Sequence, residues 1–153
     1  DVPLSFDRQK SSIKEQEEEF EGIDVVFDYQ GYPKEREFFY QHYLKDAVKE
    51  HPLKKDDIGI FLYDLDNDGT KEVLVYLHNL GLCGVKGCLF EIFKSQYTLK
   101  DSQKQGYQNL PTGWGVLPER VKILDNSTLG YRDIEIAGSI WKWNGSKYDE
   151  FKN

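Results

Sequence analysis

Apolar positions along this chain fall into short blocks, and the two densest blocks lie on either side of an acidic stretch. Residues 58–63 and 72–78 are rich in Ile, Leu, Val, Phe and Tyr, which favour strands, and the stretch 64–72 carries four carboxylates. A third block, 88–94, follows after a short connection. Three successive strands with short connections predict an antiparallel meander.

One segment has a helical period instead. Between residues 34 and 50, Phe39, Tyr43 and Ala47 form an apolar stripe with charged residues opposite, which predicts a helix. Pro52 is expected to end this helix, because the residue before a proline avoids the helical conformation. The apolar stripe needs a partner, so we expect the helix to pack on the sheet.

The remaining blocks predict strands at 23–29, 120–124, 131–136, 139–143 and 147–151. Asn144-Gly145 between the last two predicts a type I′ turn. Residues 94–108 are polar and indicate a strand end or loop, while the Gly- and Pro-rich segment 106–118 cannot be a helix or a central strand. The fold class is therefore α+β, with an antiparallel sheet of five to seven strands and one main helix in a single domain, 23–153. Residues 1–22 are expected to be an acidic arm, either a frayed helix or disordered.

Composition narrows the classes of function. The 153 residues fit one domain, the longest apolar run is far short of a membrane span, and the net charge is −7. No cluster of Lys or Arg alternates with aromatic residues, so nucleic acid is not an expected partner. The acidity either serves solubility or steers the protein toward a cationic partner.

Two cysteines, Cys83 and Cys88, flank a short loop that contains glycine. We expect a disulfide, which persists only in an oxidising compartment; free thiols and metal ligation are the alternatives. The sequence starts at Asp1 and contains no Met, as expected of a mature chain that has lost its signal peptide or of a trimmed chain. These features predict a periplasmic or secreted protein.

The acidic stretch carries the clearest candidate chemistry, and its carboxylates belong to Asp64, Asp66, Asp68 and Glu72. The three aspartates alternate, so their side chains converge in a tight loop, Gly69 allows the chain to reverse, and the glutamate returns from the next strand. Such a set of oxygens suits a hard cation. The spacing matches the start of an EF-hand loop, but position twelve is Val75 and the flanks are strands, so an EF-hand is excluded.

This stretch resembles the D-x-D-x-D-G-x-x-E loop of FG-GAP and VCBS-type repeats, in which apolar strands flank a calcium-binding turn. The motif occurs once, so it does not indicate a propeller. The resemblance implies calcium as a cofactor, and its ligands would be Asp64, Asp66, Asp68, the Thr70 carbonyl and Glu72. The alternative is that Asp-Asn-Asp-Gly is turn chemistry, with side chains that bond their own backbone and no metal.

No residues are assigned to a catalytic site. A nucleophilic site needs Cys or Ser beside His, but a bridged Cys83 offers no thiolate to His78, and His42 and His51 are expected on an exposed helix face. The clustered acids are also candidates for general acid–base catalysis, although a cation explains their spacing better. We therefore expect a protein that is not an enzyme.

Two loops are predicted to bind a partner: residues 81–88, stiffened by the disulfide, and residues 107–117, braced by prolines. The expected contact residues are Leu82, Gly84, Val85, Lys86, Tyr107, Leu110 and Trp114. The alternative for Tyr107 and Trp114 is that they cap the core of the sheet. Trp141 and Trp143 point to one face and are expected in the core or in a cross-strand ladder.

Four motifs between residues 57 and 151 together resemble those of small exported bacterial proteins. They are D-x-D-G-x-x-E at 66–72, C-G-x-x-G-C at 83–88, G-Y-x-D-[LI] at 130–134 and W-[ND]-G-x-x-Y at 143–148. Some type VI secretion immunity proteins, which occupy the periplasm and block peptidoglycan amidases, are similar in size and layout. The resemblance implies a non-enzymatic immunity protein that inhibits a cell-wall hydrolase through a projecting loop. A calcium-binding structural or adhesion module is the competing prediction.

Overall fold

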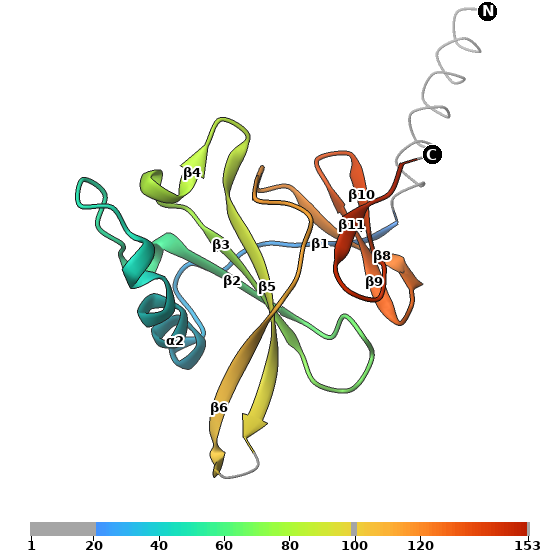
Figure 1. The fold of residues 1–153 in the computed structure, drawn as a ribbon, viewed down its shortest axis with the longest axis horizontal. Helices are drawn as coiled ribbons and strands as arrows, with labels where there is room; N and C mark the ends of the chain where they lie inside the picture. Colours follow the sequence, from blue (N-terminus) through green and yellow to red (C-terminus); the bar gives the residue numbers. More distant parts are fainter. Residues whose placement is uncertain (1–20, 99–100, 153) are drawn as a thin grey trace, which may run out of the picture.

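Two antiparallel sheets and one main helix make up the protein (Figure 1), whose computed structural model describes residues 21–98 and 101–152. The predicted α+β class is confirmed. The strands are divided between two sheets of five and six strands, whereas the sequence predicted a single sheet. Of the predicted arm 1–22, residues 1–20 lie outside the described residues.

The six-stranded sheet, which we call the central sheet, contains the predicted meander. Its path runs through β2 (Ile58–Tyr63), β3 (Glu72–Leu77), β5 (Gly87–Thr98) and β4 (Cys83–Gly84), and β5 also pairs with β6 (Asp101–Leu110) and β7 (Val116–Leu117). All of these pairs are antiparallel. The first two strands have nearly the bounds that their apolar blocks predict.

The five-stranded sheet, which we call the second sheet, is built mainly from the C-terminal part of the chain. In order, its strands are β1 (Gly22–Asp24), β8 (Val121–Thr128), β9 (Tyr131–Ile136), β10 (Ser139–Trp143) and β11 (Tyr148–Glu150). The strand predicted at 23–29 is shorter than expected, because the chain leaves β8 after Asp24 and Asp28 then makes a bridge to Ile60 of the central sheet.

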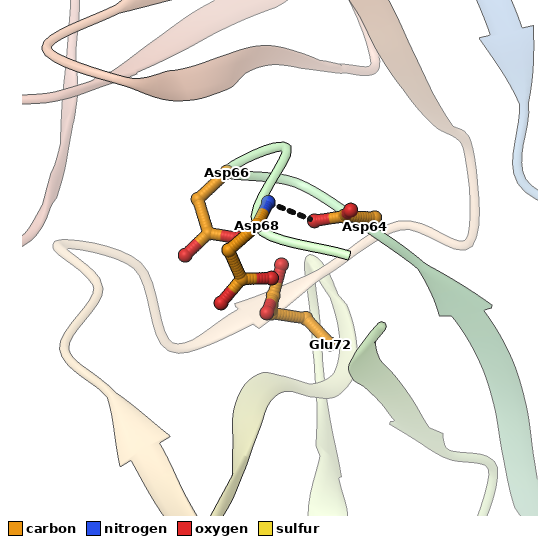
Figure 2. A group of neighbouring side chains, drawn as sticks. All are labelled: Asp64, Asp66, Asp68 and Glu72. Carbon is orange, nitrogen blue, oxygen red and sulfur yellow. Dashed lines mark hydrogen bonds between the residues drawn. The ribbon is translucent and has the colours of Figure 1, made fainter. Parts of the chain in front are cut away.

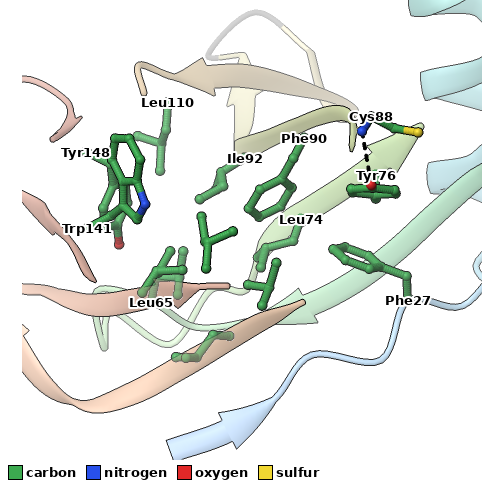
Figure 3. Packing of buried hydrophobic residues seen from close by; sticks show 14 residues of the cluster. Phe27, Leu65, Leu74, Tyr76, Cys88, Phe90, Ile92, Leu110, Trp141 and Tyr148 are labelled. Atoms are coloured by element: carbon green, nitrogen blue, oxygen red, sulfur yellow. Dashed lines mark hydrogen bonds between the residues drawn. The ribbon is translucent and has the colours of Figure 1, made fainter. Parts of the chain in front are cut away.

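The two faces of the central sheet serve two separate cores. On β3, Leu74 and Tyr76 face the second sheet, where they pack with Phe90, Ile134 and other apolar residues (Figure 3). Val73, Val75 and Leu77 point to the opposite face and pack against α2 (Pro33–Tyr43) through Phe39 and Tyr43. Because β3 is covered on both faces, its residues after Glu72 form a continuous apolar run rather than an alternating one.

The helix ends earlier than its sequence pattern predicts. The predicted stripe is confirmed by Phe39 and Tyr43, which are buried, but the helix stops at Tyr43 and one 3-10 turn continues to Asp46. Ala47 is extended, and a bridge between Val48 and His51 closes a tight turn just before Pro52. The helix therefore ends well before the proline, whose own restriction falls on the preceding residue, His51.

The polar segment predicted as a strand end or loop at 94–108 is a long hairpin. β5 continues to Thr98, and β6 returns alongside it from Asp101 to Leu110, so the pair extends well beyond the rest of the sheet (Figure 1). Gln96 and Gln108 bond each other across the two strands. The sequence of this segment is mostly polar, so it shows no apolar alternation by which a strand pair could be recognised.

The predicted type I′ turn at Asn144-Gly145 is wrong. Trp143 pairs with Tyr148, which leaves a four-residue loop, and only Gly145 of the predicted pair has a positive φ. The Asn144 side chain accepts bonds from the N–H groups of Ser146 and Lys147, both at 2.9 Å, and this fixes a wider turn. Two-residue links with positive φ at both positions occur instead at 129–130 and 137–138, where Leu-Gly and Ala-Gly give a weaker sequence signal.

Candidate metal site

The acidic loop joins β2 to β3 at residues 64–71, and its backbone is shaped by its own side chains. Asp64 accepts bonds from the N–H groups of Asp68 (3.2 Å) and Gly69 (2.8 Å), and Asp68 accepts one from Thr70 (2.8 Å). Asn67 and Gly69 have left-handed φ values of 57° and 89°, which reverse the chain. The turn chemistry considered as an alternative to metal binding is therefore present.

Those turn bonds do not account for the whole cluster. One ligand atom from each of Asp64, Asp66, Asp68 and Glu72 lies within 4.8 Å of the others, and Figure 2 shows the four carboxylates grouped around one point. Glu72 is completely buried; its Oε1 accepts the Leu65 N–H at 2.7 Å, whereas its Oε2 has no partner. Asp66 Oδ1 is also buried without a partner. Two buried oxygens without a hydrogen-bond donor are the feature that a bound cation would explain.

The charges in the cluster affect one another. Burial raises the pKa of Glu72 to about 7, and the nearby Asp66 and Asp68 add to this rise while the Leu65 N–H opposes it. Burial also raises the pKa of Asp66. The Thr70 N–H lowers the pKa of Asp68. Negative charge inside the loop is therefore unfavourable, and a bound cation would reduce this cost.

One positively charged side chain already lies against the carboxylates of the cluster. The Lys94 ammonium lies 2.6 Å from Asp66 Oδ2 and 3.5 Å from Asp68 Oδ2. Lys94 is on β5, next to Phe93, which pairs with Val73 across the sheet. No sequence signal identified this lysine, because the contact joins residues 28 positions apart and depends on strand register.

The predicted metal ligands are thus brought together as a set of four carboxylates. The structure shows Thr70, the fifth predicted ligand, donating its N–H to Asp68 Oδ1; the predicted role of its carbonyl stays a prediction. The donors are all carboxylate oxygens, which fit a hard divalent cation but do not by themselves select calcium.

The loop is also attached to the second sheet. Leu65 is buried in the core between the two sheets, and its carbonyl accepts the N–H of Arg132 on β9 at 2.9 Å. The Arg132 guanidinium lies over the ring of Tyr63, 5.7 Å from its centroid. The acidic loop therefore sits at the junction between the sheets, so its conformation affects how they are joined.

The predicted disulfide is present. Cys83 and Cys88 are bridged, with their sulfur atoms 1.98 Å apart, and they pair directly across β4 and β5. The free thiols and metal ligation considered as alternatives are excluded for this pair in the structure. At the loop tip Gly84, Val85 and Lys86 are exposed, while Leu82 is half-buried against the core that α2 covers.

The second predicted contact loop is packed into the protein. Trp114 stacks on Phe90 and donates its indole N–H to the Phe90 carbonyl at 2.8 Å, and Leu110 is buried. Tyr107 packs against Phe38, with the two ring centroids 4.6 Å apart. These contacts support the alternative that the side chains cap the core. In this conformation Leu110 cannot offer a surface to a partner.

The other predicted core aromatics behave as expected. Trp141 is buried in the core between the sheets, edge-on to Trp114, and Trp143 packs against Tyr131 of the neighbouring strand. An exposed residue that the sequence did not single out is Leu80, whose exposed fraction is 74% beside the disulfide loop. The sequence does not indicate that this leucine is exposed, because its exposure depends on the 3-10 turn 80–82.

The described part of the chain has no helix that is long and apolar enough to cross a membrane. Searches for similar proteins found no matching family model, no matching curated protein and no matching solved structure.

Proposed function

We propose that the acidic loop is a structural calcium site in an exported binding protein. The observation that supports this proposal is the Glu72 carboxylate, which is fully buried, faces the carboxylates of the loop and has one oxygen without a partner. Asp64, Asp66 and Asp68 complete a set of oxygen donors of the kind calcium prefers. The disulfide supports export, because such bonds persist in oxidising compartments.

The role of the ion would be to fix the shape of the protein. When bound, calcium would supply positive charge that neutralises the carboxylates of the loop. The loop holds Leu65 in the core between the sheets and accepts the Arg132 N–H from the second sheet. An ordered loop would therefore stabilise the junction of the two sheets as well as the β2–β3 hairpin.

Thermal unfolding in calcium and in chelator tests this function. At about one hundred times its dissociation constant, calcium should stabilise the fold by about 2.7 kcal/mol, which raises the melting temperature by about 5 to 10 °C in a domain of this size. Asp66→Asn should remove most of this shift, because it replaces a carboxylate whose buried oxygen lacks a partner.

Asp149→Asn on the exposed face of β11 makes the same chemical change away from the loop and should leave the shift intact. The proposal would be overturned if the wild-type protein showed neither a thermal shift nor heat of binding with millimolar calcium.

A second candidate function is favoured by the disulfide loop. We propose that the protein is a non-enzymatic inhibitor of a cell-wall hydrolase, as its resemblance to immunity proteins implies. Val85 is fully exposed at the tip of the loop that the disulfide closes, and Leu80 in the preceding 3-10 turn is 74% exposed, so this region offers two exposed apolar side chains. A pre-ordered loop loses little entropy on binding. The net charge of −7 would favour association with a basic hydrolase.

Inhibition of a purified peptidoglycan amidase from the same genome tests this second function. Changing Leu80 and Val85 together to Asp should weaken inhibition at least tenfold, because charge replaces apolar contact at the interface. Leu129→Asp, at an exposed turn of the second sheet, introduces the same residue type and should have no effect. If the double variant inhibits as well as the wild type, this loop is not the contact surface.

A further inference from the structure

The acidic loop holds a positive charge that belongs to the chain itself. The Lys94 ammonium lies against Asp66 Oδ2 and Asp68 Oδ2, at 2.6 Å and 3.5 Å. The Lys94 side chain is about one-third exposed. The same aspartates belong to the group of four carboxylates that includes Glu72, whose Oε2 has no hydrogen-bond partner.

The backbone of Lys94 is held in the sheet, so only its side chain can move. Its backbone lies in β5, where Phe93 is buried and paired with Val73 and where Lys94 itself is paired with Gln108. Its ammonium also lies 5.9 Å from the centroid of the Tyr131 ring on the second sheet. The ring face offers a place for an ammonium that leaves the aspartates, since aromatic faces attract cations.

We propose that Lys94 is an internal competitor for the divalent cation, and that binding of the ion releases its ammonium from Asp66 and Asp68. This inference rests on the proposed calcium function. The ammonium repels a divalent cation bound among the same carboxylates, and its charge-assisted bonds make Asp66 Oδ2 and Asp68 Oδ2 less available as ligands. Lys94 thus lowers the affinity of the loop for calcium, and its positive charge partly neutralises Asp66 and Asp68 when calcium is scarce.

Calcium titration by calorimetry of the wild type, Lys94→Gln and Lys94→Arg tests this competition. Lys94→Gln should bind calcium about tenfold more tightly, because no ammonium has to be displaced. Lys94→Arg keeps the charge and should stay close to the wild type. Lys71→Gln removes one positive charge from the exposed end of the same loop, and it should change the affinity by less than about threefold.

A second measurement follows the lysine directly. In the wild type, saturating calcium should increase the rate at which an amine-acylating reagent modifies Lys94, measured by mass spectrometry of peptides. The rate at Lys71 should not change. A Lys94 rate that is unchanged or lower in calcium would contradict release of the ammonium.

The outcomes separate this inference from the function on which it rests. Equal calcium affinities for the wild type and Lys94→Gln would overturn the competition and leave the calcium site intact. Binding by Lys94→Gln alone would support the competition but show that the lysine replaces the ion in the wild type, which overturns the proposed function. No binding by either protein would overturn both.

Discussion

Replacing Arg36 with alanine is expected to lower the free energy of unfolding by about 3 to 5 kcal/mol. The guanidinium is 7% exposed and donates hydrogen bonds only to backbone carbonyls among the described residues, those of Gly31, Lys55, Ile58 and Asp28. Removing it leaves the Gly31 and Ile58 carbonyls without this donor, each at a cost of about 1 to 3 kcal/mol unless water reaches it, whereas the Asp28 and Lys55 carbonyls keep the backbone N–H groups of Ile60 and Ile58. These carbonyls join the segment before α2, the turn before β2 and β2 itself.

Urea denaturation measures this effect. Arg120→Ala removes the same side chain from an exposed position and should change stability by less than about 0.5 kcal/mol. A loss of less than about 1 kcal/mol for Arg36→Ala would mean that water replaces the guanidinium, so that the side chain does not hold these segments together.

Glu72→Gln should have opposite effects on the metal-free and calcium-bound proteins. Without metal it should stabilise the fold by about 1 to 3 kcal/mol above pH 7, because it removes a buried charge. The glutamine oxygen can still accept the Leu65 N–H, and its amide can donate to the neighbouring aspartates. The stabilisation by calcium should largely disappear, because a carboxylate ligand is lost.

The sign of the pH dependence follows from the pKa of Glu72, which burial raises from 4.5 to about 7. A raised carboxyl pKa means that the folded protein binds an extra proton, so the metal-free wild type loses stability as the pH rises from about 4.5 to about 7. The advantage of Glu72→Gln should therefore be absent below about pH 4.5 and complete above about pH 7.

Chemical denaturation in metal-free buffer at several pH values, repeated with calcium, checks this prediction. Glu150 on β11 is exposed, so Glu150→Gln should change neither the stability of the metal-free protein nor the stabilisation by calcium. A Glu72→Gln protein that is less stable than the wild type at pH 8 without metal would show that the buried carboxylate is tolerated without a cation.

The calcium and partner proposals involve different parts of the central sheet. The acidic loop lies at the β2–β3 end beside the second sheet, whereas the disulfide loop lies where β3 passes through residues 78–82 into β4 (Figure 1). The strand β3 links the two loops directly. Calcium would thus support the sheet that carries the disulfide loop without itself contacting a partner there.

Local physics in the sequence determined a large part of the fold. The apolar runs on either side of the acidic loop, the helical stripe with Phe39 and Tyr43, and the close spacing of Cys83 and Cys88 each depend on neighbours in the chain. The alternating aspartates and Gly69 likewise determine the turn through bonds within a few residues. Such features can be recognised because propensity, periodicity and turn chemistry act over short distances.

The division into sheets, the burial of side chains and the contacts between distant residues depended on the tertiary structure. It divided the strands between two sheets, buried Trp114 against Phe90, and placed Arg36 among backbone carbonyls up to 22 positions away. At the candidate site it buried Glu72 with one oxygen unpartnered and brought Lys94 onto Asp66. Burial and contact across strands depend on register and layer packing, which no short stretch of sequence contains. The sequence by itself therefore determined the turn and the acidic residues of the loop, and the packed structure determined how their charges are grouped and balanced.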